Sequence, residues 1–142
     1  MSDPLVVPYR ELGISGARPY PFLHLTGLDG RGRMIPSLID SGADSTVLPV
    51  GYAPLMGYSR VDLIFEQGTQ VGGSITLRRA IRPSRGCVPE FPDLIFDVTP
   101  FFVDGCQHAL WGRADLMRHF DVTIMERRQQ FTLRLSTDQA DT

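Results

Sequence analysis

The chain alternates apolar and polar residues over many short stretches, which Gly and Pro separate from one another. Alternation with a period of two predicts strands that bury one face, and almost no stretch keeps the period of a helix. The pattern therefore predicts a mostly β fold. Two hairpins are expected early in the chain, one pairing residues 20–26 with 33–40 around the turn 29–32, the other pairing 61–66 with 74–78 around the Gly-rich tip 68–73.

The second half of the chain predicts fewer regular elements. Residues 94–103 have a strand pattern, and residues 122–125 and 131–135 predict a closing hairpin. A short helix is expected over residues 114–119, where Leu116 and Met117 are apolar and Gly112-Arg113 precedes them.

Proline and polarity predict the irregular segments. Residues 82–92 contain Pro83, Pro89 and Pro92, which lack an amide hydrogen, so a loop is expected there rather than a central strand. The tails, up to about residue 15 and after residue 136, are expected to be loosely ordered.

Composition limits the function classes. A length of 142 residues and a hydrophobic content of 42% fit one domain, residues 1–142, with a core over about 20–135. The net charge of -2, from 14 basic and 16 acidic residues spread along the chain, predicts no basic face for nucleic acid or an anionic membrane. No apolar stretch approaches the roughly 20 residues of a spanning helix, so a cytoplasmic location is expected.

Cysteine and histidine give no metal-ligand spacing. Cys87 and Cys106 lie in no CxxC or Cys/His cluster, which favours free thiols and leaves a single disulfide as the alternative. His24, His108 and His119 are read as ordinary surface or partly buried histidines. No metal and no cofactor is expected.

One short motif carries candidate chemistry. An apolar strand ends in Leu38-Ile39-Asp40-Ser41-Gly42-Ala43, which places a carboxylate at the end of a buried strand. Such a carboxylate needs hydrogen-bond donors, and the glycine lets backbone amides turn toward it. By itself the tripeptide Asp-Ser-Gly also fits a simple turn in which Asp40 satisfies nearby amides.

Three segments, in order and spacing, resemble the retropepsin-like aspartic peptidases. The residues that carry the resemblance are the active-loop sequence at 38–43 followed by Asp44, the Gly-rich hairpin sequence Val71-Gly72-Gly73-Ser74-Ile75-Thr76-Leu77, and Ala109-Leu110-Trp111-Gly112-Arg113-Ala114-Asp115-Leu116 near the C-terminus. The resemblance spans about residues 20–135. The sequence departs from the family at Trp111, which is bulkier than the usual aliphatic residue, at Thr69 and Gln70, and in the apparent insertion 82–92.

The resemblance implies a closed β-barrel, a double-psi acid-protease half, with a flap hairpin and one short C-terminal helix. It implies an aspartic endopeptidase with Asp40 as the catalytic residue, and an active loop that includes Ser41, Gly42 and Ala43. The flap that contacts a polypeptide substrate would comprise Thr69, Gln70, Val71, Gly72 and Gly73. Asp44 and Arg113 would form a structural ion pair, with a solvated cation as the alternative for Arg113.

A single Asp-Ser-Gly implies two chains. Hydrolysis by this route needs two carboxyl groups that share a proton, and the sequence holds no second Asp-Ser/Thr-Gly. A homodimer with a two-fold axis between two Asp40 residues would supply the pair.

Other interpretations remain open. The chain could be a non-catalytic binding or dimerisation module with this fold, or an unrelated small β-barrel in which Asp40 is a turn residue. Residues 68–73 superficially resemble a phosphate loop, but the Lys-Ser/Thr ending is missing. The aromatic residues of the second half are expected in the core and the pocket wall; they are Phe91, Phe96, Phe101, Phe102 and Trp111.

Overall fold

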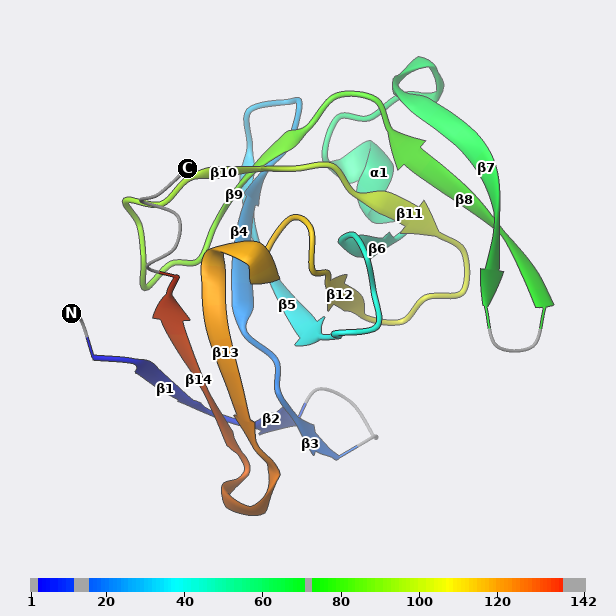
Figure 1. Ribbon diagram of the computed structural model, residues 1–142. Helices are drawn as coiled ribbons and strands as arrows, with labels where there is room; N and C mark the ends of the chain where they lie inside the picture. The colour runs from blue at the N-terminus through cyan, green and yellow to red at the C-terminus, as the bar shows by residue number, and fades with distance from the viewer. Residues whose placement is uncertain (1–2, 12–15, 71–72, 137–142) are drawn as a thin grey trace.

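The structure is a computed structural model that describes residues 3–11, 16–70 and 73–136 (Figure 1). Strands dominate it. They are β1 Leu5–Pro8, β2 Arg10–Glu11, β3 Ala17–Arg18, β4 Phe22–Thr26, β5 Gly32–Ile39, β6 Val47–Pro49, β7 Leu63–Gln70, β8 Gly73–Ala80, β9 Ser84–Cys87, β10 Phe96–Val98, β11 Phe101–Val103, β12 Ala109–Trp111, β13 Phe120–Met125 and β14 Gln130–Leu135. The helical turns are α1 Tyr52–Leu55 and the 3₁₀ turns Arg60–Asp62, Met117–His119 and Glu126–Arg128.

The strands form a large sheet and two small ones. The large sheet has the order β10-β9-β4-β5-β12-β6-β11-β8-β7, while β1-β14-β13 form a three-stranded sheet and β2 pairs with β3. The mostly β prediction is thus confirmed. Because β10 and β7 are the two ends of the large sheet, the described residues do not show the closed barrel that the resemblance implied.

The three predicted hairpins are present, and the strands of the second and third hairpins are longer than predicted. β4 pairs with β5, β7 with β8, and β13 with β14, all antiparallel. The β7–β8 strands extend to Gln70 and Gly73, further into the Gly-rich tip than the sequence pattern indicated. The stretch 94–103 divides into β10 and β11, which are separated at Thr99-Pro100.

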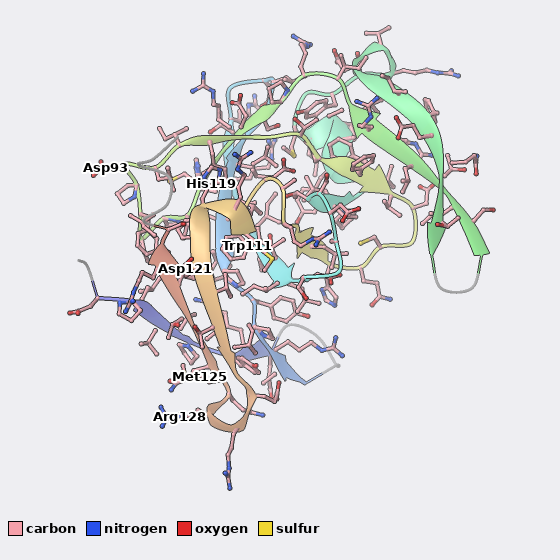
Figure 2. All side chains as sticks on the ribbon, in the orientation of Figure 1. Asp93, Trp111, His119, Asp121, Met125 and Arg128 are labelled. Atoms are coloured by element: carbon pink, nitrogen blue, oxygen red, sulfur yellow. The ribbon has the colours of Figure 1, made fainter. Side chains whose placement is uncertain are left out.

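The core lies between the large sheet and the three-stranded sheet. Alternate residues of β4 and β14 are buried, as a period of two requires. Trp111 is fully buried in the interior, whereas Arg128 lies at the exposed tip of the β13–β14 hairpin (Figure 2). No helix among the described residues is long and apolar enough to cross a membrane.

The expectation of a loop over residues 82–92 was wrong at β9. This strand pairs with β10 on one side and with β4 on the other, where Cys87 lies opposite His24. Pro83 and Pro89 flank the strand instead of interrupting it, so its four residues keep their amide donors.

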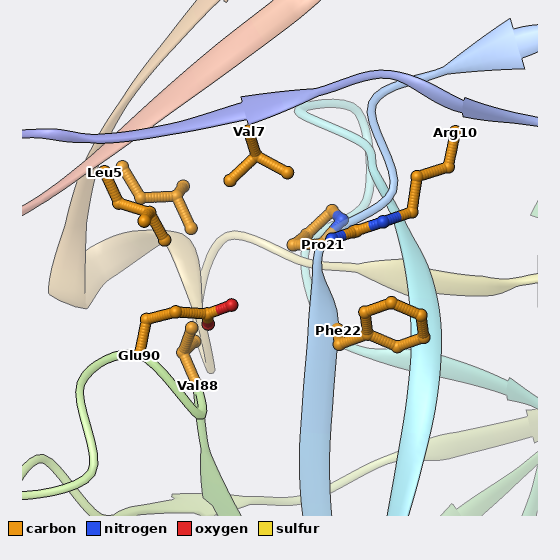
Figure 3. A pocket seen from close by; sticks show the side chains of 8 residues that line it. Leu5, Val7, Arg10, Pro21, Phe22, Val88 and Glu90 are labelled. Carbon is orange, nitrogen blue, oxygen red and sulfur yellow. The ribbon is translucent and has the colours of Figure 1, made fainter.

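The N-terminal tail is also more ordered than the sequence suggested. β1 pairs with β14, four residues to four, and Val7 is buried. A narrow gap remains between β1 and the segment after β9, and Figure 3 shows Leu5 and Val7 facing Val88 and Glu90 across it. The predicted C-terminal tail beyond residue 136 lies outside the described residues.

The predicted helix at 114–119 is a turn that ends in the 3₁₀ turn Met117–His119. The amides of Met117 and Arg118 donate to the carbonyls of Gly112 and Arg113. These bonds span five residues, whereas the bonds of an α-helix span four. The short helix α1, in contrast, was not predicted.

Candidate active site

The active loop, residues 40–46, connects β5 to β6. β12 lies between these two strands, parallel to β5 and antiparallel to β6. Parallel strands end at the same edge of a sheet, so Asp40 after β5 and Gly112 after β12 come together there. The Asp40 amide donates to the carbonyl of Trp111 at 3.3 Å.

Asp40 sits in a tight turn at the end of its strand. Its carboxylate oxygen Oδ1 accepts the amide of Gly42 at 2.9 Å, and its carbonyl accepts the amide of Ala43 at 3.1 Å. A Cβ at Gly42 would lie 3.2 Å from Oδ1, so the glycine permits this close approach. Asp40 is half-buried, while Ser41 and Gly42 are exposed. The carboxylate is thereby oriented while remaining accessible.

A cleft of about 600 Å³ opens beside Asp40. Its walls come from the active loop, from β6, β7, β8, β11 and β12, and from the segment after β11. The lining residues are Asp40, Gly42, Ala43, Val47, Thr69, Ile75, Leu77, Val103, Asp104, Gly105, Cys106 and Leu110. The cleft is mostly aliphatic, so it suits an apolar ligand that reaches a carboxylate at one end.

The β7–β8 hairpin forms one wall of this cleft. Thr69 on β7, together with Ile75 and Leu77 on β8, lines it. Gln70 ends β7, and Gly73 begins β8 at a φ of 141°, which favours glycine. Val71 and Gly72, predicted as flap residues, lie outside the described residues.

The structure brings Asp44 and Arg113 together. Arg113 Nη2 donates to Asp44 Oδ1. Their side chains are 85% and 59% exposed, respectively, so the pair is a surface ion pair. Two main-chain hydrogen bonds join the same two segments, because the amides of Arg113 and Ala114 donate to the carbonyls of Ala43 and Asp44 at 3.0 and 2.8 Å.

Two further contacts hold the active loop, and sequence reasoning gave neither a role. Asp115 Oδ2 accepts the amide of Thr46 at 3.2 Å. Burial raises the pKa of the Asp115 carboxyl, although hydrogen bonds from Thr46 and from the backbone of Thr99 partly oppose the shift. Gly112 packs directly on the Ser45–Thr46 backbone. Asp115 and Gly112 both belong to the segment 109–116, one of the three segments that resemble the retropepsin-like peptidases. Their position in this segment was the available signal in the sequence.

The three histidines lie in separate surroundings. His108 contacts the Tyr20 ring, His119 stacks on Phe96 with a centroid distance of 4.7 Å, and His24 lies against Gly32. Among the described residues, no three His, Cys, Asp or Glu side chains gather closely enough to hold a metal ion. Cys87 and Cys106 are free thiols, as expected.

Three of the five predicted aromatic residues are buried in the core, Phe91 packs against it, and Phe101 is half-buried. Phe102 and Trp111 are fully buried, and Phe96 is nearly so. None of the five aromatic residues lines the cleft, in contrast to the expectation of a pocket wall. Strands β11 and β12 turn Val103 and Leu110 toward the cleft instead, since neighbouring residues of a strand face opposite sides.

No family model and no curated protein matches the sequence. Solved structures that are similar to it include two proteases. A retropepsin-like aspartic protease from Rickettsia conorii matches with a TM-score of 0.65 and 12% identity over 94% of this chain and 100% of that chain. EIAV protease complexed with the inhibitor HBY-793 matches with a TM-score of 0.48 and 19% identity over 73% of this chain and 88% of that chain. From the first of these likenesses, which spans nearly the whole chain, it follows that this protein has the retropepsin-like fold.

Proposed function

We propose that this protein is an aspartic endopeptidase that acts as a homodimer. The observation that carries the proposal is the position of Asp40, whose carboxylate is held by the amide of Gly42 at the end of β5, an interior strand of the large sheet, and lines an aliphatic cleft of about 600 Å³. A carboxylate that only completed a turn would need no such cleft beside it.

The chemistry requires a second carboxyl group. One carboxylate of the pair would take a proton from water, and the other, protonated, would give its proton to the carbonyl oxygen of the scissile peptide bond. As it loses this proton, the water oxygen would bond to the carbonyl carbon and form a tetrahedral gem-diol. The carboxyl that took the water proton would then give it to the amine nitrogen, while the other carboxylate takes a proton from a gem-diol hydroxyl and the C–N bond breaks. Because the sequence holds one Asp-Ser-Gly, the second Asp40 would come from a second copy across a two-fold axis.

The substrate is proposed to be a polypeptide in extended conformation. Backbone groups of Gly42 on one side and of the β7–β8 tip, residues 69–73, on the other would hydrogen-bond it as an added strand. Ser41, which is exposed on the active loop, would brace the two loops across the axis. The aliphatic lining would bind apolar side chains next to the scissile bond.

The fold supports the same chemistry. The Rickettsia conorii protein of the same fold is a retropepsin-like aspartic protease by name. Fold alone does not establish activity, so the proposal rests on the Asp40 site as well.

The test is Asp40→Asn, which keeps the shape of the side chain and removes its acid–base chemistry. We expect hydrolysis of an unfolded protein substrate to fall at least a hundredfold, and a statine-containing peptide, which mimics the tetrahedral intermediate, to block the wild type. Asp121→Asn, at an exposed carboxylate on β13, is the control and should keep full activity. An active Asp40→Asn variant, or a wild type that binds peptides without cleaving them, would refute the peptidase assignment and leave a binding module.

The dimer has a separate test. Excess Asp40→Asn chains mixed with wild-type chains should suppress activity after subunit exchange, because each heterodimer lacks one carboxylate. Specific activity should also fall on dilution through the dimer dissociation constant. Activity that stays constant in both experiments, with subunit exchange verified by mass spectrometry of labelled chains, would rule out a shared site.

A further inference from the structure

The active loop is attached to the segment 111–115 mainly through the backbone. Three main-chain hydrogen bonds join them, from the amides of Asp40, Arg113 and Ala114 to the carbonyls of Trp111, Ala43 and Asp44. These bonds do not depend on side-chain identity. The side-chain contacts between the two segments therefore distinguish this chain from others with the same backbone.

Those side-chain contacts differ in burial. The Asp44–Arg113 pair is exposed, and exposed ion pairs contribute little because water screens them and both side chains lose freedom. Asp115 is half-buried, and its partner Thr46 is fully buried. A buried amide that loses its acceptor is left unsatisfied, which is the more costly change.

Thr46 is the anchor at the far end of the loop. Its amide donates to Asp115 Oδ2, and its carbonyl accepts the amide of Phe101 at 2.9 Å, which ties the loop to β11. The backbone of Thr99, just before β11, contributes to lowering the pKa of the Asp115 carboxyl, against the larger effect of burial. The Asp115 carboxylate thus joins the active loop to the segment after β12.

We propose that Asp115 is a positioning residue for Asp40: by holding Thr46 it fixes the active loop, and with it the distance from each Asp40 carboxylate to its counterpart in the second copy. This inference rests on the proposed function. The required property of Asp115 is an oxygen at this position rather than a negative charge, because burial already disfavours the charged form. Asn keeps an oxygen there, and Ala does not.

The experiment compares Asp115→Ala with Asp115→Asn in the full-length protein. The control is Tyr58→Phe, which removes the donor of a hydrogen bond to the carbonyl of Arg82 at 2.9 Å, away from the active loop. Hydrogen exchange at the amides of Arg113 and Ala114, which donate to the loop, is measured by NMR. Steady-state kcat and KM are measured on a peptide substrate under conditions where circular dichroism shows every variant folded.

We expect Asp115→Ala to accelerate exchange at both amides about tenfold and to lower kcat about tenfold, with KM changed by less than about threefold. Asp115→Asn should stay within about threefold of the wild type in each quantity. Tyr58→Phe should lose stability without changing exchange at these amides or kcat. If Asp115→Ala does not fold, Asp115→Ser, whose hydroxyl is too short to reach Thr46, takes its place with the same expectations.

The proposal is overturned if Asp115→Ala, or Asp115→Ser in its place, keeps wild-type exchange at the amides of Arg113 and Ala114. It is equally overturned if the kcat of that variant per folded dimer equals that of the wild type. It is also overturned if Tyr58→Phe lowers kcat as much, since general loss of stability would then explain the effect. A wild type without hydrolytic activity would contradict the proposed function instead, and the exchange measurement would still decide whether Asp115 holds the loop.

Discussion

Replacement of Gly112 by Ala tests how tightly the active loop is packed. A Cβ at this position would lie 2.2 Å from the carbonyl carbon of Ser45, 2.3 Å from its oxygen and 2.7 Å from the amide nitrogen of Thr46. Ordinary contacts of a Cβ begin near 3.4 Å. All three neighbouring atoms belong to the backbone, so no side-chain rotation relieves the overlap, and the two segments must separate by about 1 Å.

That separation has two measurable consequences. Overpacking of this kind destabilises a folded protein by about 3 kcal/mol when the neighbours cannot move aside, and we expect this loss in urea denaturation. Displacement of the loop that carries Asp40 by about 1 Å should lower kcat/KM about a hundredfold. The unfolding measurement does not depend on the proposed function, whereas the kinetic measurement does.

Gly51→Ala is the matched control. Gly51 precedes α1 with a φ of -61°, which any residue adopts, and a Cβ there meets no atom within 4 Å. We expect unchanged activity and a stability equal to or about 0.5 kcal/mol above that of the wild type, because Ala has fewer unfolded conformations to lose. Wild-type stability in Gly112→Ala, or an equal loss in both variants, would show that the loop is not packed as described.

Two further predictions concern ion pairs. Arg113→Gln should destabilise the protein by less than about 1 kcal/mol, because the pair with Asp44 is exposed. A double-mutant cycle with Asp44→Asn at low and high salt measures the coupling energy. A loss of unfolding free energy above about 2 kcal/mol would contradict the surface role. The Asp62 carboxylate accepts the amide of Ser59 at 2.8 Å, pairs with Arg82 at 2.7 Å and accepts the Ser59 hydroxyl at 2.9 Å, and these contacts lower its pKa from 3.8 to about 2. A lowered folded-state pKa stabilises the protein above the unfolded-state value near 4, and this stabilisation is lost as the pH falls toward 2. Thermal unfolding from pH 5 to 2 should therefore show a shallower acid loss of Tm in Asp62→Asn than in the wild type, and parallel curves would contradict the assignment.

Local pattern was sufficient for the hairpins and for the position of the candidate site. Strands β4 and β5, for example, follow from alternation on both sides of a Gly-containing turn, since period and turn chemistry act over a few residues. The sequence around Asp40 likewise located the end of strand β5, although only two residues of this strand are buried. Both features depend on neighbours in the chain.

Long-range pairing decided the rest. The prolines of 82–92 suggested a loop, but β9 pairs with β4, about sixty positions earlier along the chain, and with β10. Local sequence patterns do not predict these pairings. The expected helix at 114–119 became a turn, in which the amides of Met117 and Arg118 bond five residues back and those of Arg113 and Ala114 bond to the active loop. The insertion of β12 between β5 and β6 brought Asp115 to Thr46, 69 positions apart. Sequence alone determined which residues carry the candidate chemistry, and tertiary structure determined which residues hold them in place, because hydrogen bonds between distant segments form only when the sheet is complete.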